Sequence, residues 1–228
     1  MRRHRFFFPP LAMMFFLFFL IILLILSVVI TSVFRALGFS PWTTITIFFL
    51  VLFGSTINIP IYSKRVQQPV RTSRSGFMMD FLYPRFEKES RYREIKTTVA
   101  VNLGGAIIPL LISFYLIYTN LDLIFQFAFG ILIVALISYR FSRVVPRMGI
   151  SLPLFIPPMI AAIVAIALPG ADTIIAFVSG VTGVLIGADL MNLDKISELG
   201  SSMMSIGGAG TFDGIFLTGI VSVLIAAI

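Results

Sequence analysis

Seven runs of mostly apolar residues, each close to 20 residues long, follow one another along this chain. A hydrocarbon core about 30 Å thick needs about 20 apolar residues in helical form to cross it. The chain is 58% hydrophobic and only 12% charged, whereas soluble domains use about 25% charged residues to face water. The runs also lack the two-residue alternation of a membrane barrel. The sequence therefore predicts an all-α, polytopic bundle of about seven transmembrane helices, forming a single membrane domain over residues 1–228.

Short polar or turn-forming segments mark the limits of these runs. Trp42 stands where an interfacial anchor belongs, and Pro169 with Gly170 turns the chain between the fifth and sixth runs. The first run exceeds the roughly 7–15 apolar residues of a signal peptide, so we expect a retained anchor helix. The spans are predicted at about residues 11–30, 43–62, 98–118, 121–139, 150–168, 171–190 and 204–228.

The longest polar stretch, residues 63–97, separates the second span from the third. Its first part is rich in turn-forming residues and predicts an open loop. Its second part has Glu87 with Arg91, and Glu89 with Arg93, at i,i+4 spacing, which favours an exposed helix that leads into the third span.

Basic residues are distributed unevenly between the two sides of such a bundle. With the N-terminus inside and the C-terminus outside, all 17 Lys and Arg residues except Arg35 fall on the inner side. We therefore attribute the net charge of +7 to the orientation of a multi-pass protein in the cytoplasmic membrane. We do not attribute it to a nucleic-acid partner, and none is expected. The expected partners are the bilayer itself and anionic lipid headgroups at the basic segment 64–96.

Two residue types are scarce, and their scarcity limits the chemistry. The chain has no cysteine, which excludes disulfides and thiol catalysis, and its one histidine, His4, lies in a basic tail. A histidine-based metal site or triad is therefore excluded, and the sequence predicts no metal and no cofactor.

Two acidic residues fall within predicted spans and away from their outer ends. Asp189 closes the sixth span, and Asp213 lies about nine residues into the seventh, roughly 13 Å from its start at 1.5 Å per residue. Intramembrane charge is costly, so such acids are candidates for function. Asp189 is equally well explained as an interfacial residue in water. The charge of Asp213 has to be relieved by a proton, a cation or a second acid, although a buried structural acid is the simpler alternative.

Uncharged polar residues and glycines occur at a similar depth. Asn58, Asn102 and Thr211 all fall in the inner half of their spans, which predicts one polar pocket shared with Asp213, or else separate interhelical hydrogen bonds. Gly208 and Gly210 lie on the same segment as Asp213 and are predicted to free backbone groups for substrate or ion binding. Ordinary small-residue helix packing explains the glycines as well.

Three fragments resemble a known family of uncharacterised, largely archaeal, prokaryotic integral membrane proteins classed as a domain of unknown function. They are Asn102–Pro109, Gly187–Leu193 and Gly207–Gly219, the last reading GGAGTFDGIFLTG. The resemblance extends from about the second span to the C-terminus and implies a polytopic membrane protein with no activity to carry over.

A looser analogy links the chain to presenilin-like and prepilin-peptidase-like aspartyl proteases, which also place one aspartate on each of two helices. Their glycine-x-glycine-aspartate motif is absent, because Thr211 and Phe212 separate Gly210 from Asp213. Only Asp189 and Asp213 carry over, as a catalytic pair.

Three functions follow from these residues. The first is an intramembrane aspartyl hydrolase, a protease, in which Asp189 and Asp213 share a proton and Asn58, Asn102 and Thr211 orient the groups. The second is a transporter or channel for a proton or small cation, with Asp213, Thr211 and glycine carbonyls as ligands. The third is a non-catalytic membrane subunit that docks through its basic segment.

Overall fold

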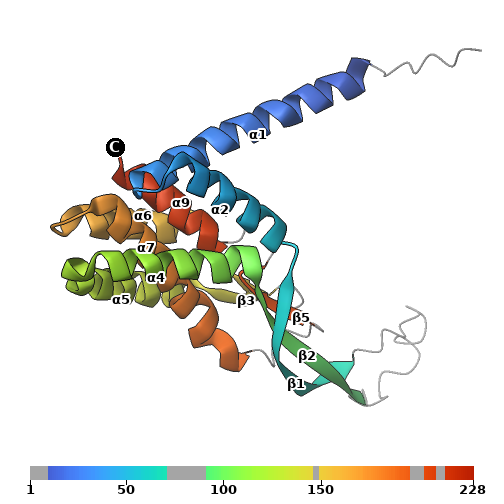
Figure 1. The fold of residues 1–228 in the computed structure, drawn as a ribbon. Helices are drawn as coiled ribbons and strands as arrows, with labels where there is room; N and C mark the ends of the chain where they lie inside the picture. The colour runs from blue at the N-terminus through green and yellow to red at the C-terminus, as the bar shows by residue number, and fades with distance from the viewer. Residues whose placement is uncertain (1–9, 71–90, 146–148, 196–202, 209–213) are drawn as a thin grey trace, which may run out of the picture.

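The computed structural model describes residues 10–70, 91–145, 149–195, 203–208 and 214–228. Most of these residues are helical, and the helices collect into one bundle from which α1 and a β-ribbon project (Figure 1). The helices are α1 (Pro10–Ala36), α2 (Pro41–Gly54), η1 (Leu103–Ile107), α4 (Ile108–Thr119), η2 (Leu121–Leu123), α5 (Ile124–Phe141), α6 (Ile156–Ala167), α7 (Asp172–Val184), η3 (Leu185–Asp189), η4 (Leu190–Lys195) and α9 (Gly214–Ala226). The strands are β1 (Asn58–Val70), β2 (Arg91–Asn102), β3 (Arg143–Val145), β4 (Gly149–Ser151) and β5 (Met203–Ile206).

The prediction of an all-α fold is wrong at the ends of four predicted spans, namely the second, third, fifth and seventh. Strands β1 and β2 form an antiparallel ribbon, and β5 adds in parallel to β2, so the sheet order is β1-β2-β5. The ribbon occupies the end of the predicted second span, the start of the predicted third span, and residues 63–70 and 91–97 of the predicted loop and helix between them. Residues 71–90 of that loop and helix lie outside the described residues. β5 likewise replaces the start of the predicted seventh span. A second, short hairpin joins β3 to β4.

The strands form where β-branched residues and a proline disfavour a helix. Thr97, Thr98, Val99 and Val101 stiffen β2 at χ1, and Pro60 in β1 cannot donate the backbone bond that a helix interior requires. The register shifts between Pro60 and Tyr62, as expected for a proline at an edge strand. Arg91 and Arg93, which suggested an exposed helix through their pairing with Glu87 and Glu89, lie in β2, and the two glutamates lie outside the described residues.

Three described helical segments are long and apolar enough to cross a membrane. They cover Ala12–Ala36, Leu121–Phe141 and Asp172–Lys195. The helices at Pro41–Gly54, Leu103–Thr119, Ile156–Ala167 and Gly214–Ala226 are apolar but shorter.

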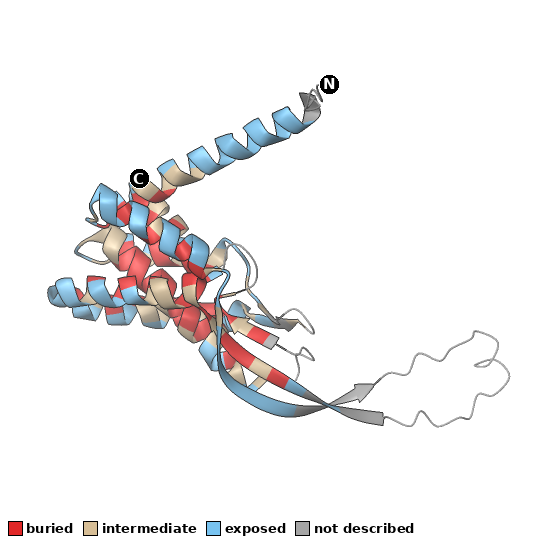
Figure 2. Ribbon diagram, turned by 45° about the vertical axis from the view of Figure 1, so that its right-hand side comes forward, coloured by how far each residue is buried: buried red, intermediate tan, exposed pale blue. Residues whose placement is uncertain are grey.

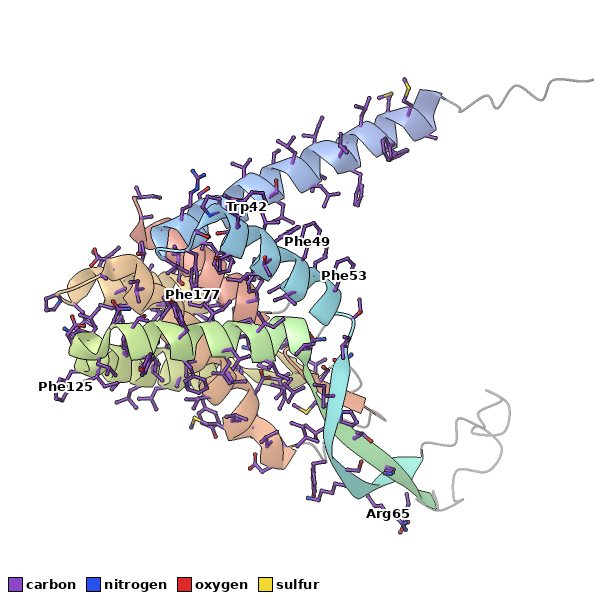
Figure 3. The ribbon with its side chains drawn as sticks, viewed as in Figure 1. Trp42, Phe49, Phe53, Arg65, Phe125 and Phe177 are labelled. Carbon is purple, nitrogen blue, oxygen red and sulfur yellow. The ribbon has the colours of Figure 1, made fainter. Side chains whose placement is uncertain are left out.

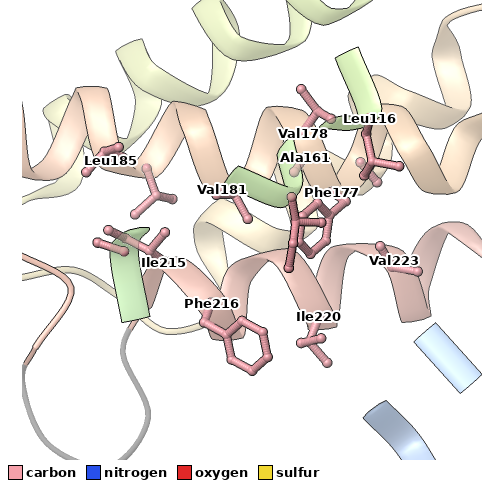
Figure 4. Packing of buried hydrophobic residues seen from close by; sticks show 14 of the residues in the cluster. Leu116, Ala161, Phe177, Val178, Val181, Leu185, Ile215, Phe216, Ile220 and Val223 are labelled. Atoms are coloured by element: carbon pink, nitrogen blue, oxygen red, sulfur yellow. The ribbon is translucent and has the colours of Figure 1, made fainter. Parts of the chain in front are cut away.

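Helix α7 lies at the centre of the bundle, packed against α4, α5, α6 and α9. Every residue from Ile175 to Val181 is buried (Figure 2). Phe177, Val178 and Val181 of α7 meet Phe216 and Ile220 of α9 in the apolar core (Figure 4). Side chains on the outer surface are also apolar: Trp42 and Phe125 are 81% and 83% exposed (Figure 3). A bundle that is apolar both inside and outside is typical of a protein that faces lipid.

Candidate functional site

A polar junction lies where the ribbon meets the bundle, and Asn102 is at its centre. Asn102 ends β2 and is 1% exposed. Its Nδ2 donates to the Ser55 carbonyl oxygen at 2.7 Å and to Asn58 Oδ1 at 3.1 Å. Its Oδ1 accepts a hydrogen bond from Gly105 N at 2.8 Å, which caps the start of η1. Asn102 therefore ties the end of α2, the start of β1 and the start of η1 together.

The same junction supports the start of the glycine-rich segment. Ser205 of β5 donates its hydroxyl to Asn58 Oδ1, so Asn58 accepts from two strands at once. A Cβ atom on Gly208 would lie 2.1 Å from Ser205 Oγ and 2.9 Å from Asn58 Oδ1, so no larger residue fits without a shift. Gly207 has a φ of +73°, a conformation that favours glycine. The backbone at Gly208 therefore packs on Asn58 and Ser205, and the backbone at Gly207 packs on Gly105 and Ala106 of η1.

The structure brings Asn58, Asn102 and Gly208 together, and their role in a functional site stays a prediction. Thr211, Gly210 and Asp213 lie outside the described residues. Sequence reasoning missed Ser205, although a lone serine between Met204 and Ile206 is a polar break in an apolar run.

Asp189 is the last residue of η3, the π-helical extension of α7, and is half-buried. The backbone beside it packs tightly on α5, because a Cβ atom on Gly187 would lie 2.0 Å from the Ala135 carbonyl oxygen. π-Helical turns often occur at functional sites. Asp189 is thus held at the end of the central helix by close backbone packing.

Asn192 fixes the chain that follows Asp189, and sequence reasoning missed it too. Its Nδ2 donates to the Ala188 carbonyl oxygen at 2.8 Å and to Ser142 Oγ at 3.0 Å. Its Oδ1 accepts from Lys195 Nζ at 2.7 Å, and that ammonium also lies 5.1 Å from the centre of the Tyr139 ring. This polar network connects the Asp189 end of α7 to the end of α5.

Helices α7 and α9 pack in an antiparallel register that relates Asp189 to the start of α9. Ser222 Oγ donates to the Ala176 carbonyl oxygen at 3.1 Å, and a Cβ on Gly180 would lie 3.2 Å from a Thr218 methyl carbon. When this register is extended along both helices, Gly214, the first residue of α9, lies opposite approximately Leu185 of η3. Figure 4 shows Leu185 and Ile215 at the same end of the packed pair. Asp189 is four residues beyond Leu185, about one helical turn or roughly 6 Å.

Three hydroxyl groups on α5 and α7 are buried without a hydrogen-bond partner among the described residues. They belong to Ser138, Ser179 and Thr182. Buried polar groups are usually paired, so these three call for an explanation. Across the same described residues, no three His, Cys, Asp or Glu side chains gather closely enough to hold a metal ion.

Comparison with known proteins gives one match, to a protein-family model. A family described as "Protein of unknown function (DUF1614)" matches residues 52–225. No curated protein and no solved structure matches the chain. The match covers the bundle, the ribbon and the junction, and leaves α1 and most of α2 outside it.

Proposed function

The chain belongs to the DUF1614 family of proteins of unknown function, and we propose that it is an intramembrane aspartyl hydrolase that cleaves peptide bonds. Asp189 and Asp213 would be its catalytic pair. The observation that carries the proposal is the antiparallel register of α7 and α9. Asp189 ends the helical extension of α7, and Gly214, the residue that follows Asp213 in the chain, starts α9 at that same end of the packed pair, which supports the pairing of the two acids.

Two carboxyl groups at close range ionise in turn, which suits hydrolysis of an amide. The ionised carboxylate takes a proton from water as the water oxygen attacks the amide carbon. The protonated carboxyl group gives its proton to the carbonyl oxygen, forming a neutral diol. The C–N bond then breaks as the nitrogen takes a proton from one acid and the diol returns a proton to the other. One water is consumed, and one carboxylic acid and one amine are released.

The remaining candidate residues fit positioning roles. Asn58 and Asn102 lock the ends of β1 and β2, and through Ser205 they support Gly208 at the start of the segment that leads to Asp213. We assign Thr211 and Gly210, on that same segment, to substrate contact and backbone freedom. A rigid support matters because catalytic groups must be held to within a fraction of an ångström.

We place the chain in the cytoplasmic membrane with seven crossings, the N-terminus inside and the C-terminus outside. The one-sided distribution of Lys and Arg supports this orientation. The cysteine-free chain allows a direct test with single cysteines at Asp122 and Arg143, both exposed. A membrane-impermeant thiol reagent added outside should modify Asp122→Cys and spare Arg143→Cys, and the reverse pattern would refute the orientation. We also propose that the Gly207–Gly219 run is a signature of the family, and that the family is largely archaeal.

An active-site probe tests the hydrolase. A photoreactive transmembrane peptide whose scissile amide is replaced by a hydroxyethylene group mimics the tetrahedral intermediate. We expect it to label the vesicle-reconstituted wild type and Asp122→Asn, a control at the far end of the bundle. Asp189→Asn and Asp213→Asn should each show a thermal unfolding transition like that of the wild type, which shows that they are folded, and should lose labelling by the probe. Labelling that survives both substitutions would exclude the aspartate pair.

Cation or proton transport is the second candidate, and the unpartnered hydroxyls of Ser138, Ser179 and Thr182 favour it. Small cations such as Na⁺ are bound through oxygen atoms, which these hydroxyl groups offer. The test is the flux of Na⁺ or protons into vesicles that contain the protein. A flux that is lost in Ser179→Ala and is not inhibited by the peptide probe would support transport over hydrolysis.

A further inference from the structure

The side chains of the β1–β2 ribbon change from apolar to basic with distance from the bundle. Near the bundle, Ile59, Ile61 and Tyr62 are 42%, 68% and 53% exposed. Immediately beyond them, Lys64 and Arg65 are exposed as well. Figure 3 shows Arg65 far out on the ribbon, away from the bundle. The order of apolar side chains, then tyrosine, then cations is the order of chemical environments from a bilayer core to its headgroups.

The basic part of the ribbon also places like charges directly opposite each other. Arg65 is the cross-strand partner of Lys96, so both side chains lie on the same face of the ribbon. Glu94 offsets little of this repulsion, because its carboxylate is 3.9 Å from the Arg65 guanidinium and both side chains are exposed to water, by 61% for Glu94 and 82% for Arg65. Like charges in directly opposed positions destabilise a sheet unless an anion lies between them.

We infer that the ribbon crosses the membrane surface at Tyr62 and that Lys64, Arg65 and Lys96 bind the headgroups of anionic phospholipids. The inference is independent of the proposed hydrolase, since it concerns where the ribbon lies and not what the aspartates do. A phosphate between Arg65 and Lys96 would relieve their repulsion. Each cation near an anionic surface contributes about 1 kcal/mol, or about fivefold in relative binding.

A bilayer fits this surface better than a soluble acidic partner does. Ile59 and Ile61 are exposed on the same strand as the cations, and lipid acyl chains would cover them without a specific protein surface. The helix before β1 also presents apolar rings outward, since Phe49 and Phe53 of α2 are 48% and 67% exposed (Figure 3). Exposed apolar side chains therefore occur on both sides of the polar turn at Ser55 and Thr56, in α2 and in β1.

Lipid-selective quenching tests the inference on the full chain. A fluorescent label on Ser63→Cys, the only cysteine, reports on lipids beside the ribbon in phosphatidylcholine vesicles with 30% phosphatidylglycerol, about the content of many anionic test membranes. Brominated phosphatidylglycerol should quench more strongly than brominated phosphatidylcholine at equal content. Arg65→Gln and Lys96→Gln should each lower that preference, by up to about fivefold. The matched control Arg35→Gln, an exposed cation at the end of α1, should leave it unchanged.

Two outcomes would overturn the inference. The first is equal quenching by the two brominated lipids in the wild type. The second is inorganic phosphate in neutral vesicles stabilising the wild type as much as phosphatidylglycerol does, which would assign the site to a free anion.

The effect of Lys96→Gln on the midpoint of thermal unfolding gives a second, independent measurement, because its sign should depend on the lipid. In pure phosphatidylcholine, Lys96→Gln removes a repulsion, so its midpoint of thermal unfolding should equal or exceed that of the wild type. With phosphatidylglycerol present, the same substitution removes a lipid contact and should lower the midpoint. The same shift in both lipids would contradict lipid binding at this position.

Discussion

Helices α1 and α7 are both apolar enough to cross a membrane, yet the structure uses them in opposite ways. In the 18-residue window that represents the α1 segment Ala12–Ala36, the mean hydropathy is 3.3 and 6% of the residues are buried. In the corresponding window of Asp172–Lys195, which contains α7, the mean hydropathy is 2.0 and 72% of the residues are buried. The less hydrophobic helix is therefore the one at the centre of the bundle. Hydropathy distinguishes membrane from water, and it does not distinguish the centre of a bundle from its lipid-facing surface.

Side-chain size accounts for the difference. Lipid tails are as apolar as leucine, so helices associate in a membrane through close packing and hydrogen bonds. Helix α7 offers small residues: Gly180 meets Ser222 of α9, and Gly183 meets Val134 of α5. Helix α1 presents large side chains instead, among them Phe15, which is 66% exposed. Small residues on an apolar helix thus indicate where it is buried.

Truncating one phenylalanine in each helix would test this comparison most strongly. Phe177 of α7 is fully buried and lies 6.4 Å, centre to centre, from the Phe34 ring. Phe177→Ala should lower the free energy of unfolding by about 3–5 kcal/mol, because it leaves a cavity. Phe18→Ala, at a residue 63% exposed on α1, should change it by less than about 0.5 kcal/mol. Equal losses in reversible unfolding would refute the central position of α7.

Adding a single methyl group tests the small-residue contacts. A Cβ at Gly187 would lie 2.0 Å from the Ala135 carbonyl oxygen, so α5 and η3 have to separate. Gly187→Ala should cost about 3 kcal/mol. Gly214→Ala is the matched control, since no atom of the described residues lies within 4 Å of its Cβ position, and it should be close to neutral. A neutral Gly187→Ala would show that the α5–η3 contact is looser than described.

Some buried polar side chains of the bundle have hydrogen-bond partners and others have none among the described residues. Asn102 is an example of the first kind. Asn102→Ala removes the cap on η1 and leaves the Ser55 carbonyl oxygen without one donor. Loss of the cap and of a buried bond should together cost about 2 kcal/mol in the free energy of unfolding. Asn58→Ala removes an acceptor that is only half-buried and should cost less. The reverse order would contradict the central role of Asn102.

Ser179 represents the unpaired kind and should give the smallest effect, with the opposite sign. Its hydroxyl is buried without a partner among the described residues, so Ser179→Ala removes a desolvated polar group. We expect thermal unfolding to show a gain of up to about 1 kcal/mol. A loss of stability that depends on Na⁺ concentration would instead indicate that the hydroxyl ligates a cation.

Much of the helical framework could be predicted from the sequence, and the sheet could not. The apolar runs predicted helices where α1, α5 and α7 lie, because a long apolar run has few alternatives to a helix in lipid. The sheet was missed because Val99 to Val101 continue an apolar run without a break. Pairing between β1 and β2 joins residues on either side of a long polar segment, and no local pattern records it.

The candidate site was predictable in part. Depth along the spans suggested that Asn58 and Asn102 belong together, and they share a hydrogen bond of 3.1 Å. Ser205 was missed because its link to Asn58 depends on the parallel pairing of β5 with β2. Asn192 was missed because its bonds to Ala188 and Ser142 depend on how η4 folds back toward α5.

Cross-linking two cysteines at the aspartate positions tests the central claim most directly. The chain has no native cysteine, so Asp189→Cys with Asp213→Cys gives a single reactive pair. Under mild oxidation or with a short bifunctional thiol reagent, the register of α7 and α9 predicts efficient intramolecular cross-linking, read as lost labelling by maleimide-polyethylene glycol. The control pair, Asp172→Cys with Asp213→Cys, uses the first residue of α7, at the opposite end of that helix from Asp189, and should stay uncross-linked. Equal, low cross-linking of both pairs in a folded protein would contradict an aspartate pair and, with it, the proposed hydrolase.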